Sequence, residues 1–334
     1  MMSFGPFEIW THTINDTNLN LWVNNGDIHE ILTGSFYAGS SKNICCDFTT
    51  LLTLKELNLL DFLTDKYNVY IYQNHLDLAF QEYSKNKLVN ENGLKFLSYE
   101  HGKVKMTEYS LETVRESLKK QEELFNWINS NCIKVGKVIS NRQNEEESAI
   151  LNLQDLLKLC QTKELTLLID SSFVTNYAKE TYAVNCFSTI DLLTLLLANG
   201  EINQDSHSKL LGKLIIMGQI LIPVGKGVFT YHIKKNNYVI NQEVSLILNY
   251  LKLVYFSEEF IINTIFEILE WIWAEQVPDS NRRILTEHLC SLLCFNREQS
   301  NVIPKLIQHI KLNCKLNEDE LINIQQYIEE WCSK

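Results

Sequence analysis

Short apolar strands alternate with helical segments from residue 44 onward, and this alternation constrains the fold more than any other feature of the sequence. Strands are predicted at residues 44–47, 69–72, 166–169 and 183–187, each an apolar run too short for a stable helix. Amphipathic or leucine-rich segments separate them, at residues 49–63, 73–85, 148–160, 172–179 and 190–198. Because alternating strands and helices are typical of a parallel sheet, we expect an α/β fold.

The rest of the 334-residue chain differs in pattern from this α/β part, which we place at residues 43–225. Residues 1–42 show only weak alternation, and we interpret them as an N-terminal extension with a small strand or hairpin. Residues 95–107 resemble a β-hairpin, and a charged helix over 111–129 follows, so the two form an insertion at about 90–140. Beyond residue 240 five helical segments predict an all-α C-terminal domain over 240–334.

Composition excludes some classes of protein. The net charge of −11 argues against a broad basic surface for nucleic acid but leaves room for a local basic groove. The nine cysteines lack paired spacing, which favours reduced thiols. Cys290 and Cys294, close to His288, have a spacing that zinc ligands use, although buried cysteines on helix faces are the commoner case. With no run of about 18 apolar residues and no basic signal-peptide start, we expect a cytoplasmic protein outside the membrane.

Four acidic residues stand where they could meet at one edge of the predicted sheet. Asp47 and Asp170 each follow an apolar strand, Glu146 opens a helix, and Asp77 lies in the helix after the second strand. The carboxyl ends of parallel strands share one edge, and carboxylate oxygens suit Mg²⁺ or Mn²⁺. Such an ion activates water and neutralises charge on a phosphodiester. The structural alternatives are helix capping or a turn for the two aspartates and a solvated helix start for Glu146.

The order of these elements resembles the PIN-domain nucleases, which include toxin ribonucleases of bacterial toxin–antitoxin pairs. Residues 44–51 are similar to the family's opening strand and first acid, and residues 69–77 to its second strand and helix. Glu146 occupies the acid position of a Gly-Glu-x-x-Ala-Ile element. Residues 167–171 are similar to the late strand with its acids, and 184–193 to the closing strand and helix.

This resemblance implies a three-layer αβα domain and a metal-dependent endoribonuclease activity. Asp47, Glu146 and Asp170 would be the catalytic residues, and these three together with Asp77 would bind Mg²⁺ or Mn²⁺. The implied substrate is RNA, the implied partner is an antitoxin or another protein regulator, and toxin-type relatives suggest a homodimer.

Two departures from the family pattern leave a second hypothesis open. Ser171 stands where the family often has a second, adjacent acid, and either Asp77 or Glu82 could supply the acid of the second helix. The chain is therefore either a ribonuclease, whose helical C-terminal domain selects substrate or docks a regulator, or a catalytically inactive PIN-like module for protein interaction. In a third, purely structural reading the acids never meet.

Overall fold

A computed structural model describes residues 21–22, 28–88, 94–100, 103–109, 111–136, 145–220, 222–253 and 255–333. The chain divides into two compact units, residues 1–195 and residues 196–334, and each is described by itself. Within the described residues, no helix combines the length and the apolar character that a membrane crossing requires.

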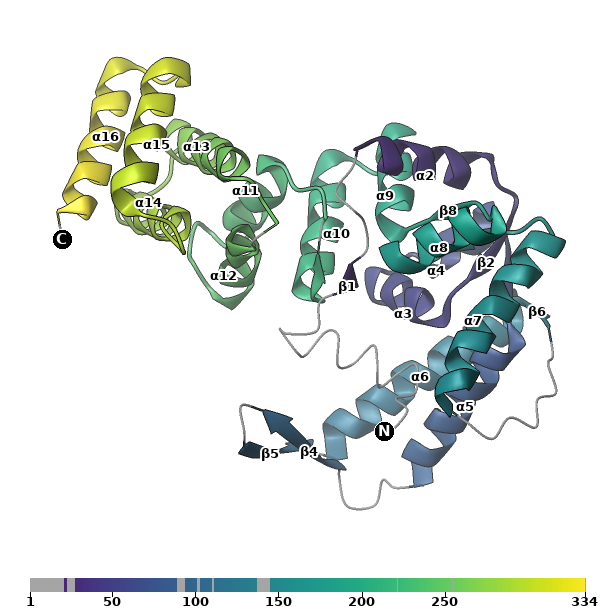
Figure 1. Ribbon diagram of the computed structural model, residues 1–334. Coiled ribbons are helices and arrows are strands. Elements are labelled where there is room, and N and C mark those ends of the chain that lie inside the picture. The colour runs from purple at the N-terminus through teal and green to yellow at the C-terminus, as the bar shows by residue number, and fades with distance from the viewer. Residues whose placement is uncertain are drawn as a thin grey trace. The chain divides into compact units, whose positions relative to one another are not determined.

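The first unit is built on a five-stranded sheet whose strands all run parallel, and Figure 1 shows the helices that surround it. The pairing places Cys46 beside both Ile71 and Leu168, so the second strand in the chain lies at the centre of the sheet. The strands, in spatial order, are β6 (Ile133–Val135), β3 (Asn68–Tyr72), β2 (Asn43–Cys46), β7 (Thr166–Leu168) and β8 (Cys186–Phe187). The predicted parallel sheet is thus confirmed.

Helices connect these strands at the predicted places. The helices of the first unit are α2 (Ile28–Ser40), α3 (Phe48–Leu57), α4 (Leu60–Lys66), α5 (Gln73–Leu88), α6 (Leu111–Asn131), α7 (Glu145–Thr162), α8 (Ser172–Tyr182) and α9 (Thr189–Ala198). Strands β4 (Leu94–Glu100) and β5 (Lys103–Tyr109) pair antiparallel and confirm the predicted hairpin. A two-residue strand, β1, spans Leu21–Trp22.

Helices cover both faces of the sheet, which explains why the strands are apolar throughout. On one face Cys45, Leu167 and Cys186 pack with Leu157 of α7 and Ala178 of α8 in a single buried cluster. Successive side chains of a strand point to opposite faces, and the alternate residues of β2 and β7 are buried as well. The sheet therefore lies between two helical layers, as the three-layer αβα prediction required.

The N-terminal region contains the small strand β1 and also a helix that the sequence did not predict, because residues 28–40 form α2. Its buried residues are Ile31, Gly34 and Ala38, whose spacing of three and four places them on one helix face. Glycine and serine lower helix propensity here, so the short apolar face was hidden in the sequence. The strand expected at residues 7–12 lies outside the described residues.

The second unit is helical, as predicted. Its elements are α10 (Gln204–Ile216), the short strand β9 (Gln219–Ile220), α11 (Lys226–Lys235), α12 (Gln242–Asn249), a 3₁₀ turn (Tyr250–Lys252), α13 (Glu258–Ala274), α14 (Asp279–Leu293), α15 (Gln299–Asn313) and α16 (Glu318–Cys332). The sequence reading missed α11, which buries Val228, Phe229, His232 and Ile233.

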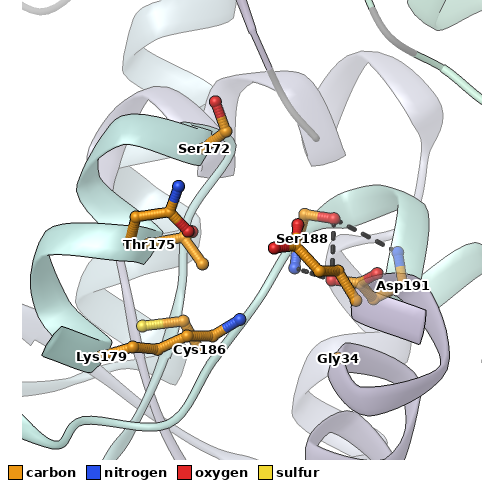
Figure 2. Close-up of a pocket in the computed structure, with 9 residues that line it drawn as sticks. Gly34, Ser172, Thr175, Lys179, Cys186, Ser188 and Asp191 are labelled. Carbon is orange, nitrogen blue, oxygen red and sulfur yellow. Dashed lines mark hydrogen bonds between the residues drawn. The ribbon is translucent and has the colours of Figure 1, made fainter. Parts of the chain in front are cut away.

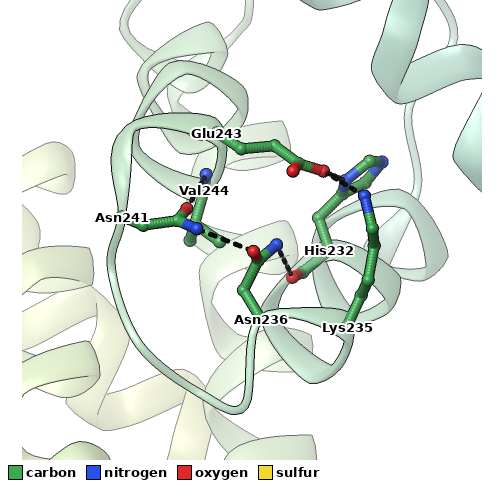
Figure 3. A network of polar contacts seen from close by, with 6 residues as sticks. All are labelled: His232, Lys235, Asn236, Asn241, Glu243 and Val244. Atoms are coloured by element: carbon green, nitrogen blue, oxygen red, sulfur yellow. Dashed lines mark hydrogen bonds and ion pairs between the residues drawn. The ribbon is translucent and has the colours of Figure 1, made fainter.

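A buried polar contact joins helices α11 and α12 of this unit (Figure 3). The side chain of His232 on α11 is only 2% exposed, and its Nδ1 lies 2.7 Å from Oε1 of Glu243 on α12. The same carboxylate oxygen accepts a hydrogen bond from Lys235 at 2.9 Å. Burial lowers the pKa of His232 below its ordinary value, while the Glu243 carboxylate opposes this shift. His232 is thus a buried core residue that Glu243 holds through Nδ1.

Candidate active site and metal site

The carboxyl ends of β2, β7 and β8 lie side by side, and an aspartate follows each of these strands. The backbone N–H of Asp47 donates to the carbonyl of Leu168 at 3.1 Å, which continues the β2–β7 pairing beyond the last strand residues. The backbone N–H of Asp170 in turn donates to Oγ1 of Thr50 at 3.0 Å. Asp47 and Asp170 therefore start from adjacent backbone positions at one edge of the sheet.

Asp47 is the N-cap of α3. Its Oδ2 accepts hydrogen bonds from the backbone N–H groups of Thr49 and Thr50, at 3.0 and 3.3 Å, and from the Thr49 hydroxyl. The capping role that we weighed for this residue is thus present. Its other oxygen, Oδ1, lies 3.8 Å from Nδ1 of His75 in the first turn of α5. One carboxylate oxygen thus serves the fold, while the other faces a polar side chain from the neighbouring strand–helix unit.

Asp170 is 3% exposed and has one hydrogen bond to each carboxylate oxygen. Both come from Thr189 at the start of α9, from its backbone N–H and from its hydroxyl, each at 2.7 Å. Burial raises the pKa of Asp170 to about 6. The Thr189 hydrogen bonds work against this shift, whereas the negative charges of Asp47 and Asp191 add to it. The Asp170 carboxylate is therefore within electrostatic reach of two other acids.

Asp191 is a site residue that sequence reasoning missed. Ser188 donates to its Oδ2 from the backbone N–H at 2.7 Å and from the hydroxyl at 2.9 Å (Figure 2). The Ser188 hydroxyl accepts from the Asp191 N–H at 3.3 Å, so the pair forms a capping box at the start of α9. The Oδ1 atom of Asp191 is buried, and no described residue donates a hydrogen bond to it.

Burial also raises the pKa of Asp191 to about 6. Hydrogen bonds from Ser188 and the charge of Lys179 hold it down, whereas Glu30 of α2 raises it further. A small pocket with a cavity volume of about 20 Å³ adjoins this carboxylate between α2 and α8 (Figure 2). Lys179 and Glu30 both line this pocket, together with Gly34, Ser172, Thr175, Asn176, Cys186, Ser188 and Asp191.

The other predicted site residues are not all placed beside these aspartates. Oδ1 of Asp77 accepts a hydrogen bond from Gln73 at 2.6 Å, within its own helix. His75, rather than Asp77, supplies the contact from α5 to Asp47. Glu146 lies in the first turn of α7, but its side chain is outside the described residues. Ser171, where an acid was expected, is the N-cap of α8 and accepts from the Val174 N–H at 3.4 Å.

In the part of the chain that the structure describes, no three histidine, cysteine, aspartate or glutamate side chains are close enough to hold one metal ion. The Glu146 side chain lies outside this described part. What the geometry gives is a buried carboxylate, Asp170, flanked by the charges of Asp47 and Asp191. This arrangement concentrates negative charge at the sheet edge where open α/β folds bind ligands.

Comparison with known proteins agrees with the fold. Residues 45–180 match the model of a family described as the PIN domain associated with the TPR-GreAB-C-PIN system. Searches of curated proteins and of solved structures gave no significant match. The matched segment contains the end of β2, the strands β3 and β7, and the aspartates Asp47 and Asp170. Residues 45–180 of this chain therefore belong to the PIN-domain family.

Proposed function

We propose that the PIN domain is a metal-dependent endoribonuclease that hydrolyses RNA phosphodiesters at the edge formed by β2, β7 and β8. The observation that carries this proposal is the buried Asp170, whose pKa is raised to about 6 with contributions from the charges of Asp47 and Asp191. Buried like charges are costly, and a bound divalent cation would relieve the repulsion. Perturbed carboxylates gathered at a sheet edge are characteristic of functional sites.

The residues at this edge fit a hard cation. The donor atoms are carboxylate oxygens, which Mg²⁺ and Mn²⁺ prefer. Oδ1 of Asp191 is buried without a hydrogen-bond donor among the described residues, and the hydrogen bonds that cap α3 all go to Oδ2 of Asp47, leaving its Oδ1 toward the site. We assign Asp47 and Asp170 as ligands, with Glu146 completing the set from α7, Asp77 as a further candidate from α5, and Asp191 adding negative charge beside them.

Each side chain has a task that follows from its surroundings. A bound metal ion would supply the charge that activates water and stabilises the developing negative charge on the phosphate. Thr189 fixes the orientation of Asp170 with two hydrogen bonds, so that little reorganisation is needed when the site loads. Because the pKa of Asp170 is about 6, the carboxylate is mostly ionised above pH 7 and ready to bind.

RNA cleavage tests the proposal. Purified protein is incubated with a mixed pool of single-stranded RNA and Mn²⁺, alongside the variant Asp170→Asn and the matched control Asp61→Asn. Asp61 is an exposed residue in the first turn of α4. We expect wild type and the control to cleave and Asp170→Asn to lose at least about a hundredfold in rate, as removal of one electrostatic stabiliser does elsewhere. Equal cleavage by Asp170→Asn, or none by the wild type, would contradict the assignment.

One observation favours the alternative of a catalytically inactive module for protein interaction. All three aspartates already hold structural hydrogen bonds: Asp47 caps α3, Asp191 caps α9, and Asp170 ties β7 to Thr189. The alternative predicts no cleavage and no rise in melting temperature with Mn²⁺. The family description names an associated TPR-GreAB-C-PIN system, which supports a protein partner under either reading. An antitoxin-type regulator, a homodimer and a cytoplasmic location are also parts of this proposal. Co-purification would test for the regulator, and light scattering would test for the homodimer.

A further inference from the structure

A polar cleft lies between helices α14 and α16, built entirely from residues of the second unit. Its cavity volume is about 360 Å³, at the lower end of the ~300–1,000 Å³ typical of small-ligand pockets. Arg282 and Arg283 follow Asp279 in α14 by three and four positions. Residues at these spacings share one helix face, so all three line the same side of the cleft. Asn323 and Gln326 come from the facing side of α16.

Two arginines of the cleft lie over aromatic rings. The guanidinium carbon of Arg282 is 4.8 Å from the centre of the Trp273 ring, and that of Arg283 is 4.4 Å from the centre of the Tyr327 ring. Trp273 and Tyr327 contact each other, with ring centres 5.4 Å apart. Such cation–π contacts hold the guanidinium groups in place before any ligand arrives. Both arginines are therefore preorganised.

Some N–H donors of these two arginines have no hydrogen-bond acceptor among the described residues. The hydrogen bonds of Arg282 run from Nη2 to the backbone carbonyls of Glu275 and Val277, each at 3.4 Å. No described residue accepts from its Nε. Arg283 is 57% exposed, and its Nε lies 3.7 Å from Oδ2 of Asp279, an exposed ion pair that contributes little. The exposed guanidinium of Arg283 thus offers N–H donors to the acceptors of a phosphate or a base, whereas the Nε of Arg282 is buried.

The cleft also offers hydrogen-bond acceptors, which narrows the class of ligand. Asp279 lies at one side, and Glu330, which accepts from Gln326 Nε2 at 3.1 Å, lies at the other. A ligand for this cleft must therefore carry donors as well as an anionic group. A nucleotide does so, with base amino groups, a ribose 2′-hydroxyl and a phosphate. A peptide rich in Asp and Glu has side chains without donors and would be repelled by both carboxylates.

We propose that this cleft binds one nucleotide of single-stranded RNA; the proposal rests on the proposed function, whose substrate it would hold. A base stacks on the guanidinium plane of Arg283 or on the Tyr327 ring, as bases do in RNA-binding proteins. The amides of Asn323 and Gln326 bind base edges, and an arginine binds the adjacent phosphate. The second unit thereby selects unpaired RNA.

Binding of a short fluorescein-labelled single-stranded RNA to the full chain in EDTA, followed by anisotropy, tests this proposal without cleavage. Arg283→Gln removes the charge of an exposed side chain, so the fold should persist. We expect this variant to bind about tenfold more weakly and to lower the salt-dependence slope by ~0.7, the value for one phosphate contact on a single strand. The control Lys305→Gln removes the same charge from α15, where Lys305 pairs with Glu258, and should bind like wild type.

Equal RNA affinity of Arg283→Gln and wild type would overturn the proposal, as would binding of an acidic peptide in preference to RNA. The result is separable from the fate of the nuclease proposal. If wild type never cleaves RNA but Arg283-dependent binding persists in EDTA, the cleft stands and the nuclease assignment fails. If RNA is cleaved yet binding is indifferent to Arg283→Gln, only the cleft proposal fails.

Discussion

Replacing Asp170 by asparagine should stabilise the metal-free protein. The pKa of this carboxyl is about 6 in the fold, against an ordinary value of 3.8. At ~1.36 kcal/mol per pKa unit, the ionised form costs about 3 kcal/mol at pH 8. Asparagine carries no charge and has the same shape. Its carbonyl oxygen can accept from the Thr189 N–H, and its amide can donate to the Thr189 hydroxyl, so the hydrogen bonds need not be lost.

The sign of the pH dependence follows from the direction of the pKa shift. A carboxyl whose folded pKa is raised binds protons more tightly in the native state than in the unfolded state. Its stabilising contribution is therefore complete below about pH 4, declines between about pH 4 and pH 6, and is absent above. The advantage of Asp170→Asn over wild type should accordingly be small at low pH and reach about 3 kcal/mol at pH 8.

Urea unfolding in EDTA at several pH values measures this difference, with Asp61→Asn as the control. A surface substitution of that kind usually changes stability by less than ~0.5 kcal/mol. Mn²⁺ at a thousand times its Kd should reverse the order, because a ligand at that concentration adds ~4.1 kcal/mol to the form that binds it, more than the advantage of Asp170→Asn at pH 8. An Asp170→Asn protein that is less stable at pH 8, or whose advantage does not vary with pH, would refute the electrostatic reasoning.

Two further substitutions probe the same edge. Thr189→Val removes a hydroxyl that donates to the Asp170 carboxylate, so the pKa of Asp170 should rise above about 6. The pH at which Mn²⁺ begins to raise the melting temperature should then move upward. An unchanged onset pH would contradict this prediction. Gly34→Ala would place a methyl group closer than 3.0 Å to the Asp191 carboxyl atoms. Ser188 holds that carboxylate in place, so we expect a loss of ~1–3 kcal/mol in thermal or urea unfolding despite the better helix propensity of alanine, and a gain would show that α2 does not pack there.

The sheet could be predicted from sequence because buried parallel strands are short apolar runs. Residues 44–46 and 167–169 carry no polar residue, since helices cover both faces of the sheet. The helix of residues 28–40 could not be predicted in the same way. Its inner face consists of Ile31, Gly34 and Ala38, and two of these are too small to give a clear apolar stripe.

The site was predicted in part, for a local reason. Asp47 and Asp170 were found because each comes directly after an apolar strand. Asp191 was missed because it lies four residues beyond Phe187, the last residue of β8, within the apolar helical segment expected at residues 190–198. The signal that could have found it is the capping-box pattern from Ser188 to Asp191, directly after the strand. In the structure, Asp191 supplies a negative charge at the sheet edge, where Ser171 supplies none.

Binding of Mn²⁺ to the metal-free protein tests the central claim most directly. Electron paramagnetic resonance at about pH 8, above the pKa of Asp170, measures the signal of free Mn²⁺. The decrease of this signal when protein is added gives the amount of bound Mn²⁺. The account predicts that a bound ion is detected in wild type and in Asp61→Asn, and that its affinity falls at least about tenfold in Asp47→Asn and in Asp170→Asn. Absence of bound Mn²⁺ in the wild type, or equal affinity in all four proteins, would show that these carboxylates do not form a metal site.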